Sequence, residues 1–287
     1  MTENSNLYAE RRRGRKKRVT KLRGTSLVAA VAVILIYALA VHTCDVKGEH
    51  RSASTAAPMD ELMDVRIPAG TPEVIKGYTG FAVSFNPTHR VPNYVAWELT
   101  GEEARGTVPR NSDFHPDPDV AGCPTLADYR GSGFDRGHMA PAAEMKWSAE
   151  AMYDSHVLTN MCPQDRSING GRWKTIEQLE QQWAKADSAL IIITGPILSD
   201  EITRTIGNGV SVPERFFRVI FSPYVEPPRA IAFIVPNMPT DLGVFEMAVS
   251  VDEVEAATGF DFLSALPDEI ETEVERESKI NIWRRLR

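Results

Sequence analysis

Cysteine is scarce in this chain: the three cysteines, at positions 44, 123 and 162, lie far apart in the sequence. This spacing argues against a structural zinc site and against a fold held by a disulfide framework, because both need closely spaced cysteines. A single Cys123–Cys162 disulfide stays open at this point. No internal repeat is visible, and 43% of the 287 residues are hydrophobic. The composition therefore predicts an ordinary globular protein of one or two domains.

Positive charge is scarce beyond the N-terminus. The whole chain carries a formal net charge of −7, but residues 1–24 contain nine Lys or Arg and only two Glu, which leaves −14 for the remainder. Non-specific affinity for nucleic acid arises largely from neutralising phosphate groups, so an acidic domain is poorly suited to it. If this chain acts on nucleic acid, it either concentrates arginines at one place or binds weakly and relies on a metal ion. The candidate arginines are Arg90, Arg110, Arg130, Arg136, Arg166 and Arg172.

The segment after the basic run, TSLVAAVAVILIYALAVHTC at 25–44, has no charged side chain apart from the titratable His42. Its length is close to what a membrane-spanning helix needs, and the preceding basic run predicts a cytoplasmic N-terminus. We therefore expect a membrane anchor, with the rest of the chain on the extracytoplasmic side of a bacterial inner membrane or in the periplasm. A signal peptide cleaved at ALA (38–40) would instead give a secreted protein, and a buried core helix is the third alternative.

Composition divides the chain into four parts. Residues 1–24 are predicted to be a basic cytoplasmic segment and 25–44 a transmembrane signal anchor. Residues 45–66 are small and polar with no sustained period, which is typical of a flexible linker. The folded domain is expected over 67–287.

Short β-rich segments dominate this domain, with few helical ones between them. Apolar side chains at helical spacing predict a helix within 169–186, and a shorter helix over 251–259 is expected to end at Gly259. The pattern predicts an α+β fold, a central antiparallel sheet with flanking helices. The expected strands are 80–86, 94–100, 156–161, 189–196, 215–222 and 229–236, with hairpins joining the first two and the last two.

The stretch DRGH at 135–138 carries the first chemical signal. Arg136 is a permanent, planar cation that suits phosphate oxygens, and His138 readily accepts a proton near neutral pH. Gly137 is expected to let the chain bend so that both side chains face one ligand. A cation for phosphate beside a base for water is suited to phosphodiester hydrolysis, although an isolated Arg and His pair also occurs by chance on surfaces.

Three polar residues downstream strengthen that hypothesis. Asn169 precedes the predicted helix, where it could be a simple N-cap, and Asn160 could be a turn residue. Glu177 follows Asn169 by eight residues, about two helical turns, so the two side chains point in a similar direction. An amide oxygen can bind a Mg²⁺ ion that keeps most of its waters, and a nearby carboxylate can hold one of those waters.

Taken in order, DRGHMAP (135–141), NMCPQ (160–164) and NGGRWKTIE (169–177) resemble the DNA/RNA non-specific endonuclease family, the sugar-non-specific nucleases with a ββα-metal (His-Me) finger. The resemblance covers roughly residues 70–265. It implies a ββα-metal finger active site and a Mg²⁺-dependent endonuclease, with Mn²⁺ as an alternative ion. Such an enzyme hydrolyses DNA and RNA with little sequence preference and leaves 5′-phosphate ends. Relatives often form homodimers, so a homodimer is also expected.

The resemblance also implies a role for each matching residue. His138 would be the general base and Asn169 the one protein ligand of the metal. Arg136 would hold the phosphate, Asn160 would help to orient the site, and Glu177 would order the waters of the metal.

Further positions match the family less closely. Arg90 resembles a phosphate-clamping arginine, although an arginine before a strand is often only solvated. Gln181 stands where some relatives carry an arginine, so Arg172 or Lys174 would have to compensate. The other domain histidines, expected at the surface or at strand ends, are His89, His115 and His156.

Two other functions fit parts of the sequence. One is a non-catalytic DNA-binding or uptake module at the cell envelope, and the other is a phosphodiesterase for another phosphate substrate. The presence of both His138 and Asn169 favours the nuclease over the first alternative.

Overall fold

The computed structural model describes residues 61–199 and 201–286. The predicted basic segment (1–24) and membrane anchor (25–44) lie outside these residues. Within the described ranges, none of the helices combines the length and apolar character needed to cross a membrane.

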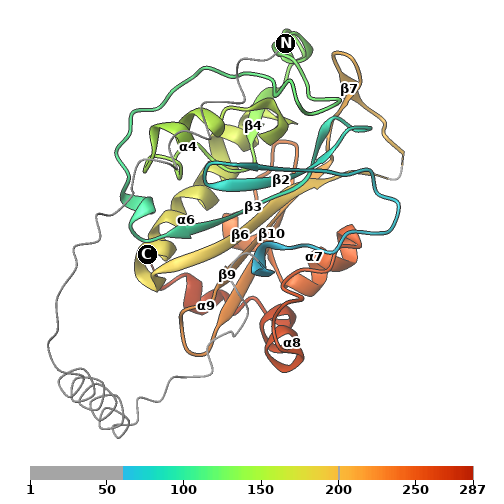
Figure 1. Cartoon of the computed structure of the whole chain (residues 1–287). Coiled ribbons are helices and arrows are strands. Elements are labelled where there is room, and N and C mark those ends of the chain that lie inside the picture. Colours follow the sequence, from blue (N-terminus) through green and yellow to red (C-terminus); the bar gives the residue numbers. More distant parts are fainter. Residues whose placement is uncertain (1–60, 200, 287) are drawn as a thin grey trace, which may run out of the picture. The chain divides into compact units, whose positions relative to one another are not determined.

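A seven-stranded antiparallel sheet forms the centre of the domain (Figure 1), as expected from the strand-rich sequence. Its order is β1-β2-β3-β6-β9-β10-β11, so both predicted hairpins, β2–β3 and β9–β10, are confirmed. The strands are β1 Val74–Tyr78, β2 Phe81–Asn86, β3 Val91–Thr100, β6 Ala189–Ile197, β9 Arg215–Ser222, β10 Arg229–Pro236 and β11 Ala248–Val249.

Strand β6 lies in the middle of this sheet and is buried along its whole length. Side chains alternate between the two faces of a strand. Leu190 and Ile192 accordingly pack into one hydrophobic cluster, while Ile191 and Ile193 pack into a second cluster on the opposite face. The apolar run of β6, which has no polar alternation, follows from this burial on both sides.

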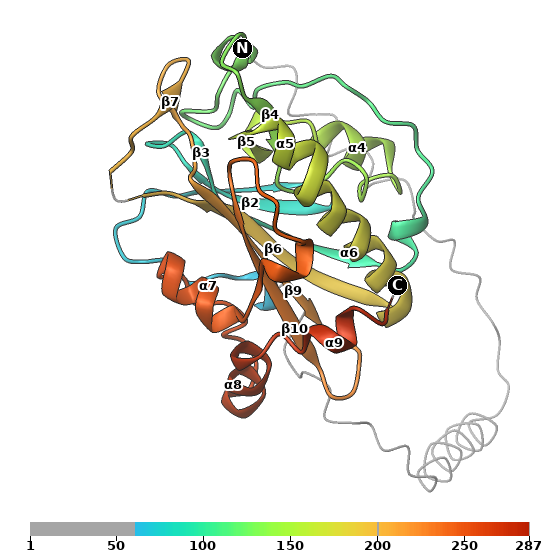
Figure 2. The same cartoon turned by 180° about the vertical axis from the view of Figure 1, so that it is seen from behind.

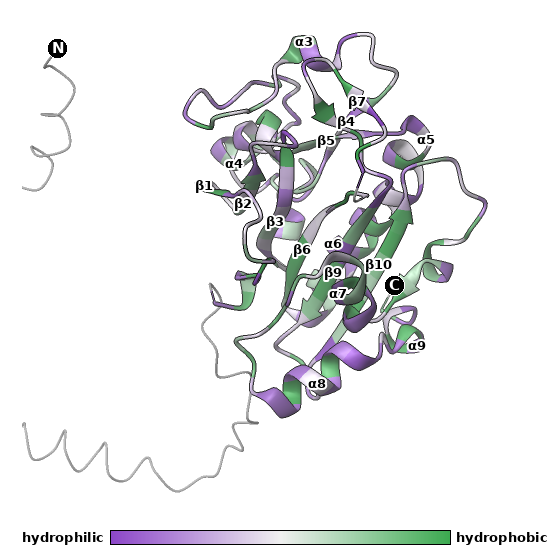
Figure 3. Ribbon diagram, turned by 90° about the vertical axis from the view of Figure 1, so that its right-hand side faces the viewer, coloured by the Kyte–Doolittle hydropathy of each residue, from purple (hydrophilic) through white to green (hydrophobic). Residues whose placement is uncertain are grey.

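Helices cover both faces of the sheet (Figures 2 and 3). Helix α6 contributes Ile176 and Trp183 to the first cluster, whereas α7 and α8 contribute Val254 and Val274 to the second. The α-helices are α3 Leu126–Tyr129, α4 Ala149–Asp154, α5 Arg166–Ile168, α6 Lys174–Asp187, α7 Val251–Thr258, α8 Asp268–Arg276 and α9 Ile280–Trp283. The single-turn helical segments are η1 Glu61–Met63, η2 Glu103–Arg105, η3 Leu158–Asn160, η4 Asn169–Trp173 and η5 Val244–Glu246.

Two short hairpins lie outside the main sheet. Strands β4 (Asp135–His138) and β5 (Met161–Gln164) pair with each other, as do β7 (Thr205–Ile206) and β8 (Val210–Ser211). Pair β4–β5 followed by α5, η4 and α6 forms a ββα arrangement, seen at the upper part of Figure 1.

Some local expectations were wrong. The strand predicted over 156–161 is mostly helical turn, and pairing begins only at Met161, because the backbone N–H of Asn160 is already bonded to the carbonyl oxygen of Val157 within this turn. Cys123 and Cys162 are free thiols, which answers the open disulfide question. Leu62 and Val65 belong to the second hydrophobic cluster, so residues 61–66 contribute to the core although a linker was expected there.

Candidate active site

The DRGH motif forms strand β4 and pairs with β5 in antiparallel register. Gly137 lies opposite Cys162, and a Cβ atom at position 137 would come within 2.4 Å of Oε1 of Gln164. The glycine is therefore required by a close approach of the Gln164 side chain and not by a bend, which corrects the sequence-based expectation. Side chains alternate between the two faces of an extended strand. Arg136 and His138 are two residues apart on β4, so they share one face.

Asn160 fixes the chain directly after His138. Its Oδ1 accepts a hydrogen bond from Ala140 N over 2.9 Å, and its Nδ2 donates to Ala140 O over 2.9 Å and to Ser155 O over 2.8 Å. The side chain is fully buried. Asn160 thus lies behind the site, where it holds the backbone in place and cannot contact a ligand in the cavity.

The imidazole of His138 is almost completely enclosed, with 7% of the residue exposed. Its Nε2 is buried and has no hydrogen-bond partner among the described residues, while its carbonyl oxygen accepts a hydrogen bond from Nε1 of Trp173. Burial first, and then the nearby charges of His156, Arg110 and Arg136, hold the pKa of His138 well below its ordinary value. His138 is therefore neutral, and able to accept a proton, at neutral pH.

Asn169 lies at the junction between α5 and the π-helical turn η4. It has helical backbone angles at this junction and is not the N-cap of α6, the simpler role considered from the sequence. Its Nδ2 donates to Oδ2 of Asp135 over 3.0 Å. Asp135 also accepts from the exposed Arg166 over 3.4 Å. The amide hydrogens of Asn169 are thus directed at Asp135, and its Oδ1 has no partner within the described residues.

Glu177 lies on the first turn of α6. Burial raises its pKa to about 7, although the positive charge of Arg218 opposes the shift. Arg218 itself is fully buried, donates to Oε1 of Glu180 over 2.6 Å, and lies over the rings of Trp97 and Trp173. A buried ionic network behind α6 therefore supports the helix that carries Glu177.

One cavity of about 1270 Å³ collects most of the candidate residues. It is lined by His138, Arg136, Asn169 and Glu177, which come from three separate segments, and also by Asp135. Its remaining charged lining residues are all cations: Arg110, Arg130, Arg166 and Lys174. The acidic chain therefore does concentrate positive charge at one place, as a polyanionic ligand requires.

Arg172 and Lys174 were considered as substitutes for an arginine at position 181, and only Lys174 lies at the cavity. Gln181 and Lys174 both line the cavity. Arg172 does not, because its Nε donates to the carbonyl oxygen of Leu242 over 2.7 Å. Lys174 is thus the cation available beside Gln181.

Arg90 does not lie at the cavity, contrary to the role expected for it. Its guanidinium donates to the carbonyl oxygens of Gly122 and Asn208, and it pairs with the buried Asp128 over 3.3 Å. These partners come from helix α3 and from two loops, so Arg90 ties three separate segments together. The same geometry leaves its side chain with few donors for a phosphate group.

The sequence reasoning missed Phe114 and His156, and it named Arg110 only as one of six arginines that could concentrate charge. Arg110 and Phe114 line the cavity, and the Phe114 ring lies 4.2 Å from the Arg136 guanidinium carbon. His156 was expected at a strand end but is fully buried, with its ring centroid 5.0 Å from that of His138. In the sequence, positions 110–114 show only a basic residue followed by an aromatic one, and this pattern is too common to identify a site.

The oxygen donors of the cavity fit a hard divalent cation. The Asn169 amide oxygen is without a protein partner in the described part of the chain, and the Glu177 carboxylate lines the same cavity. Amide and carboxylate oxygens are the ligands that Mg²⁺ prefers, and Mg²⁺ commonly keeps several waters and few protein ligands. The residues present therefore fit a divalent ion that is held by one amide oxygen and hydrated on its other sides.

Comparison with known proteins decides the family. The family model described as "DNA/RNA non-specific endonuclease" matches residues 59–269 of the chain. The chain belongs to the DNA/RNA non-specific endonuclease family. This confirms the resemblance on which the sequence analysis relied, and it places the protein in a family of nucleases.

Individual relatives agree with this family. The chain is similar to "Nuclease EXOG, mitochondrial" of Danio rerio, with 33% identity over 66% of this chain and 60% of the relative. It is also similar to "Nuclease 1, mitochondrial" of Schizosaccharomyces pombe, with 36% identity over 66% of this chain and 65% of the relative. The match thus spans less than two thirds of these two relatives. A crystal structure of the EndoG/EndoGI complex is similar with a TM-score of 0.64 and 26% identity, covering 74% of this chain and 95% of the other.

These comparisons overturn the expected location. A membrane-anchored protein at a bacterial inner membrane or in the periplasm was predicted, yet these relatives of the endonuclease are named mitochondrial nucleases. The prediction relied on the apolar composition of residues 25–44 together with the charge preceding it, and such a pattern does not identify a particular membrane.

Proposed function

We propose that this endonuclease-family member hydrolyses phosphodiester bonds in DNA and RNA, with little sequence preference and with Mg²⁺ as its metal. The observation that carries the proposal is the convergence of His138, Arg136, Asn169 and Glu177 on one cavity with a cationic lining. The charged lining suits phosphate groups, which are the same in every nucleotide and carry no sequence information. The four side chains on which the proposal relies all lie within the described residues.

His138 acts as the general base in this proposal. Since Nε2 is shielded from solvent, Nδ1 is the ring nitrogen that can reach the cavity. Nδ1 accepts a proton from a water molecule, whose oxygen then bonds to phosphorus as the bond to the 3′-oxygen breaks. The departing 3′-oxygen takes a proton from solvent water, so the products carry a 5′-phosphate and a 3′-hydroxyl. A depressed pKa keeps the ring unprotonated before the reaction.

Asn169 would hold the metal through Oδ1, and Glu177 would accept hydrogen bonds from metal-coordinated waters. When bound, the ion supplies positive charge that stabilises the scissile phosphate and the leaving 3′-oxygen. Asp135 fixes the orientation of Asn169 by accepting its amide hydrogens.

Arg136 would bind the phosphate oxygens. It makes no ion pair with any described residue, so its donors are available, and Phe114 supports its guanidinium from one side. Arg110 and Lys174, which line the same cavity, would provide further charge along the nucleic-acid backbone. We assign to Arg110 the phosphate-binding role that the sequence had suggested for Arg90.

The test uses the full chain with supercoiled plasmid and with RNA, in Mg²⁺ or in EDTA. We expect cleavage of both substrates in Mg²⁺, none in EDTA, and a loss of at least about 100-fold in His138→Ala and Asn169→Ala, because base and metal each contribute factors of this size. His89→Asn is the matched control, since His89 lies outside the cavity and bonds to Ser211. A DNA ligase should join the DNA products without prior phosphorylation, because their ends already carry 5′-phosphates.

Binding of plasmid without cleavage by the wild type would indicate a non-catalytic DNA-binding module. Cleavage of a small phosphodiester, with plasmid and RNA left intact, would indicate a different phosphodiesterase. Equal cleavage by wild type and His138→Ala would show that the assignment of the base is wrong.

A further inference from the structure

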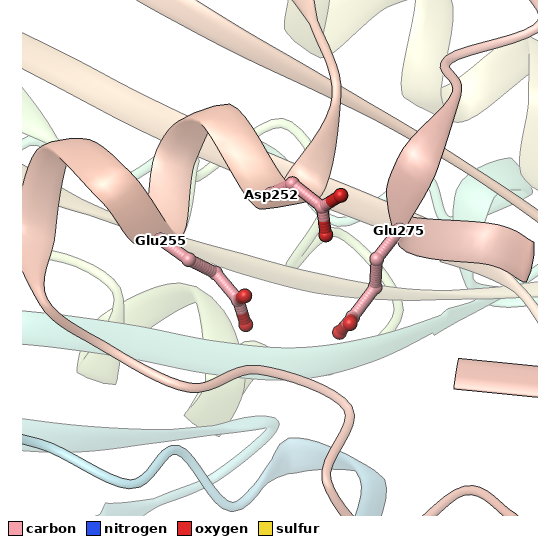
Figure 4. Close-up of side chains that lie close together, drawn as sticks. All are labelled: Asp252, Glu255 and Glu275. Atoms are coloured by element: carbon pink, nitrogen blue, oxygen red, sulfur yellow. The ribbon is translucent and has the colours of Figure 1, made fainter. Parts of the chain in front are cut away.

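Three carboxylates meet between helices α7 and α8, on the face of the sheet that is covered by the second hydrophobic cluster. Asp252 and Glu255 project from α7 and Glu275 projects from α8, and Figure 4 shows them turned toward a common space. One oxygen from each residue lies within 4.8 Å of the others. Asp252 is exposed and Glu255 partly so, whereas only 6% of Glu275 is exposed.

Glu275 is the unusual member of this cluster. Its Oε1 is buried and has no hydrogen-bond partner in the described part of the chain. A buried carboxylate oxygen without a partner is energetically costly, so such atoms usually have an ion or a donor beside them. Glu255, in contrast, already accepts a hydrogen bond from Phe262 N over 2.9 Å.

The surroundings add negative charge. Asp261 and Glu271 act on Glu275 electrostatically together with Asp252 and Glu255, and burial with this like charge raises the pKa of Glu275 to about 9. The cation near this group is the exposed Arg66, which pairs with Asp261 over 3.1 Å. Among the described residues, none of the three clustered carboxylates takes part in an ion pair. Their mutual repulsion is therefore uncompensated by protein cations.

We propose that Asp252, Glu255 and Glu275 form a binding site for a Ca²⁺ ion, separate from the catalytic metal. One oxygen from each carboxylate lies within 4.8 Å of the others, so a single ion can contact all three. Mg²⁺ gives up its waters reluctantly and usually binds through one or two carboxylates, whereas Ca²⁺ takes about six to eight oxygen ligands in flexible geometry. The set of three carboxylates therefore favours Ca²⁺, with water completing the coordination.

Such an ion would connect α7 to α8. Both helices pack on β10, and their apolar side chains belong to the second hydrophobic cluster. Glu275 lies beyond residue 269, where the match to the family model ends. The site therefore stabilises the C-terminal part of this chain and does not depend on the proposed catalytic function.

The competing explanation is a protonated Glu275 with no ion. A neutral carboxyl group could donate to Glu255 or Asp252, and Ca²⁺ would then have no effect. The two explanations differ in the number of protons released when Ca²⁺ is added. Ca²⁺ binds the ionised carboxylate, so it must displace the proton held by Glu275.

The experiment compares the thermal unfolding temperature of the full chain in CaCl₂ with that in EDTA. Isothermal titration calorimetry with CaCl₂ measures binding of the ion directly. All proteins carry Asn169→Ala, which removes binding at the catalytic site. At a Ca²⁺ concentration about 100-fold above Kd, mass action predicts a rise in Tm of roughly 5–10 °C. Near pH 7, titrations in buffers of different ionisation enthalpy should show release of about one proton per ion.

Variants then locate the site. Asp252→Asn should abolish the Tm shift, and because Asp252 is exposed this variant should fold. Glu275→Gln removes the buried charge without a change in volume and should also abolish the shift. Glu269→Gln, on the exposed side of α8, is the matched control and should retain it. An equal shift in Asp252→Asn and in the control, or no Ca²⁺ binding by the Asn169→Ala protein, would overturn the proposal.

Discussion

Asn169 and Asp135 are joined by a hydrogen bond of 3.0 Å from the side-chain amide to Oδ2 of the carboxylate. This bond links the first residue of β4 to the turn that precedes α6. It uses the amide hydrogens of Asn169 and leaves the amide oxygen for the cavity. The DRGH motif and the downstream Asn169 therefore act as one unit, although 34 residues separate them in the sequence.

Asp135→Ala should weaken metal binding more than it weakens folding. Without its acceptor, the Asn169 side chain can rotate, and loss of such an orienting partner usually costs about 10–100-fold in metal affinity or activity. The measurement is plasmid cleavage across a range of Mg²⁺ concentrations, where the half-saturating concentration should rise. Asp119→Asn, an exposed acid away from the cavity, serves as the control. An unchanged Mg²⁺ dependence would exclude the orienting role.

Glu177 should control the pH dependence of cleavage near neutrality. Its pKa is raised to about 7, and the ionised carboxylate accepts hydrogen bonds from metal-coordinated waters more strongly than the neutral acid does. Activity should therefore rise as the pH increases through about 7. The depressed pKa of His138 places the protonation of the base at a lower pH. In Glu177→Gln, kcat/KM should be lower and the step near pH 7 should vanish. If that step persists in the variant, another group is responsible.

Asn160→Ala should destabilise the fold strongly. The substitution leaves the backbone N–H and C=O of Ala140 and the C=O of Ser155 without partners in a fully buried place. At about 1–3 kcal/mol for each unsatisfied group, we expect the free energy of unfolding to fall by at least about 3 kcal/mol. Urea unfolding measures this loss, with the exposed Asn208→Ala as the comparison. A change below about 1 kcal/mol would contradict the structural role of Asn160.

Alanine substitutions of Arg110 and Arg90 should have opposite effects: the first should lower activity and the second should lower stability. Arg110→Ala removes a cavity cation, so kcat/KM should fall about tenfold or more and cleavage should depend less steeply on salt, with stability nearly unchanged. Arg90→Ala removes the partner of the buried Asp128, so it should lower stability by about 2–4 kcal/mol and spare kcat/KM at low temperature. Cleavage assays and urea unfolding on both variants test this reversal. Equal kinetic loss in the two variants would contradict it.

Local patterns were sufficient for the main elements of the fold. Strand β6 and the hairpins β2–β3 and β9–β10 are rich in apolar and β-branched side chains, which fit the buried, pleated surface of a sheet. Gly259 ends α7 in a left-handed conformation, as its position after the helix predicts. The strand expected over 156–161 is wrong because Asn160 N bonds to Val157 O within a local turn, while the Asn160 side chain bonds to Ala140, twenty residues away.

The sequence by itself determined the family, because DRGH, Asn160, Asn169 and Glu177 occur as an ordered set of polar residues. It also determined that any cationic surface had to be local, since the chain beyond residue 24 is acidic. Only the tertiary structure decided which arginines reach the cavity. Arg90 is held by loops that are distant in the sequence, whereas Arg110 lies beside His138. The tertiary structure also decided the environment of Glu275, whose unpartnered oxygen depends on how α8 packs beside α7. In both cases the burial of a side chain and its distance from other charges arise from contacts that no local sequence pattern encodes.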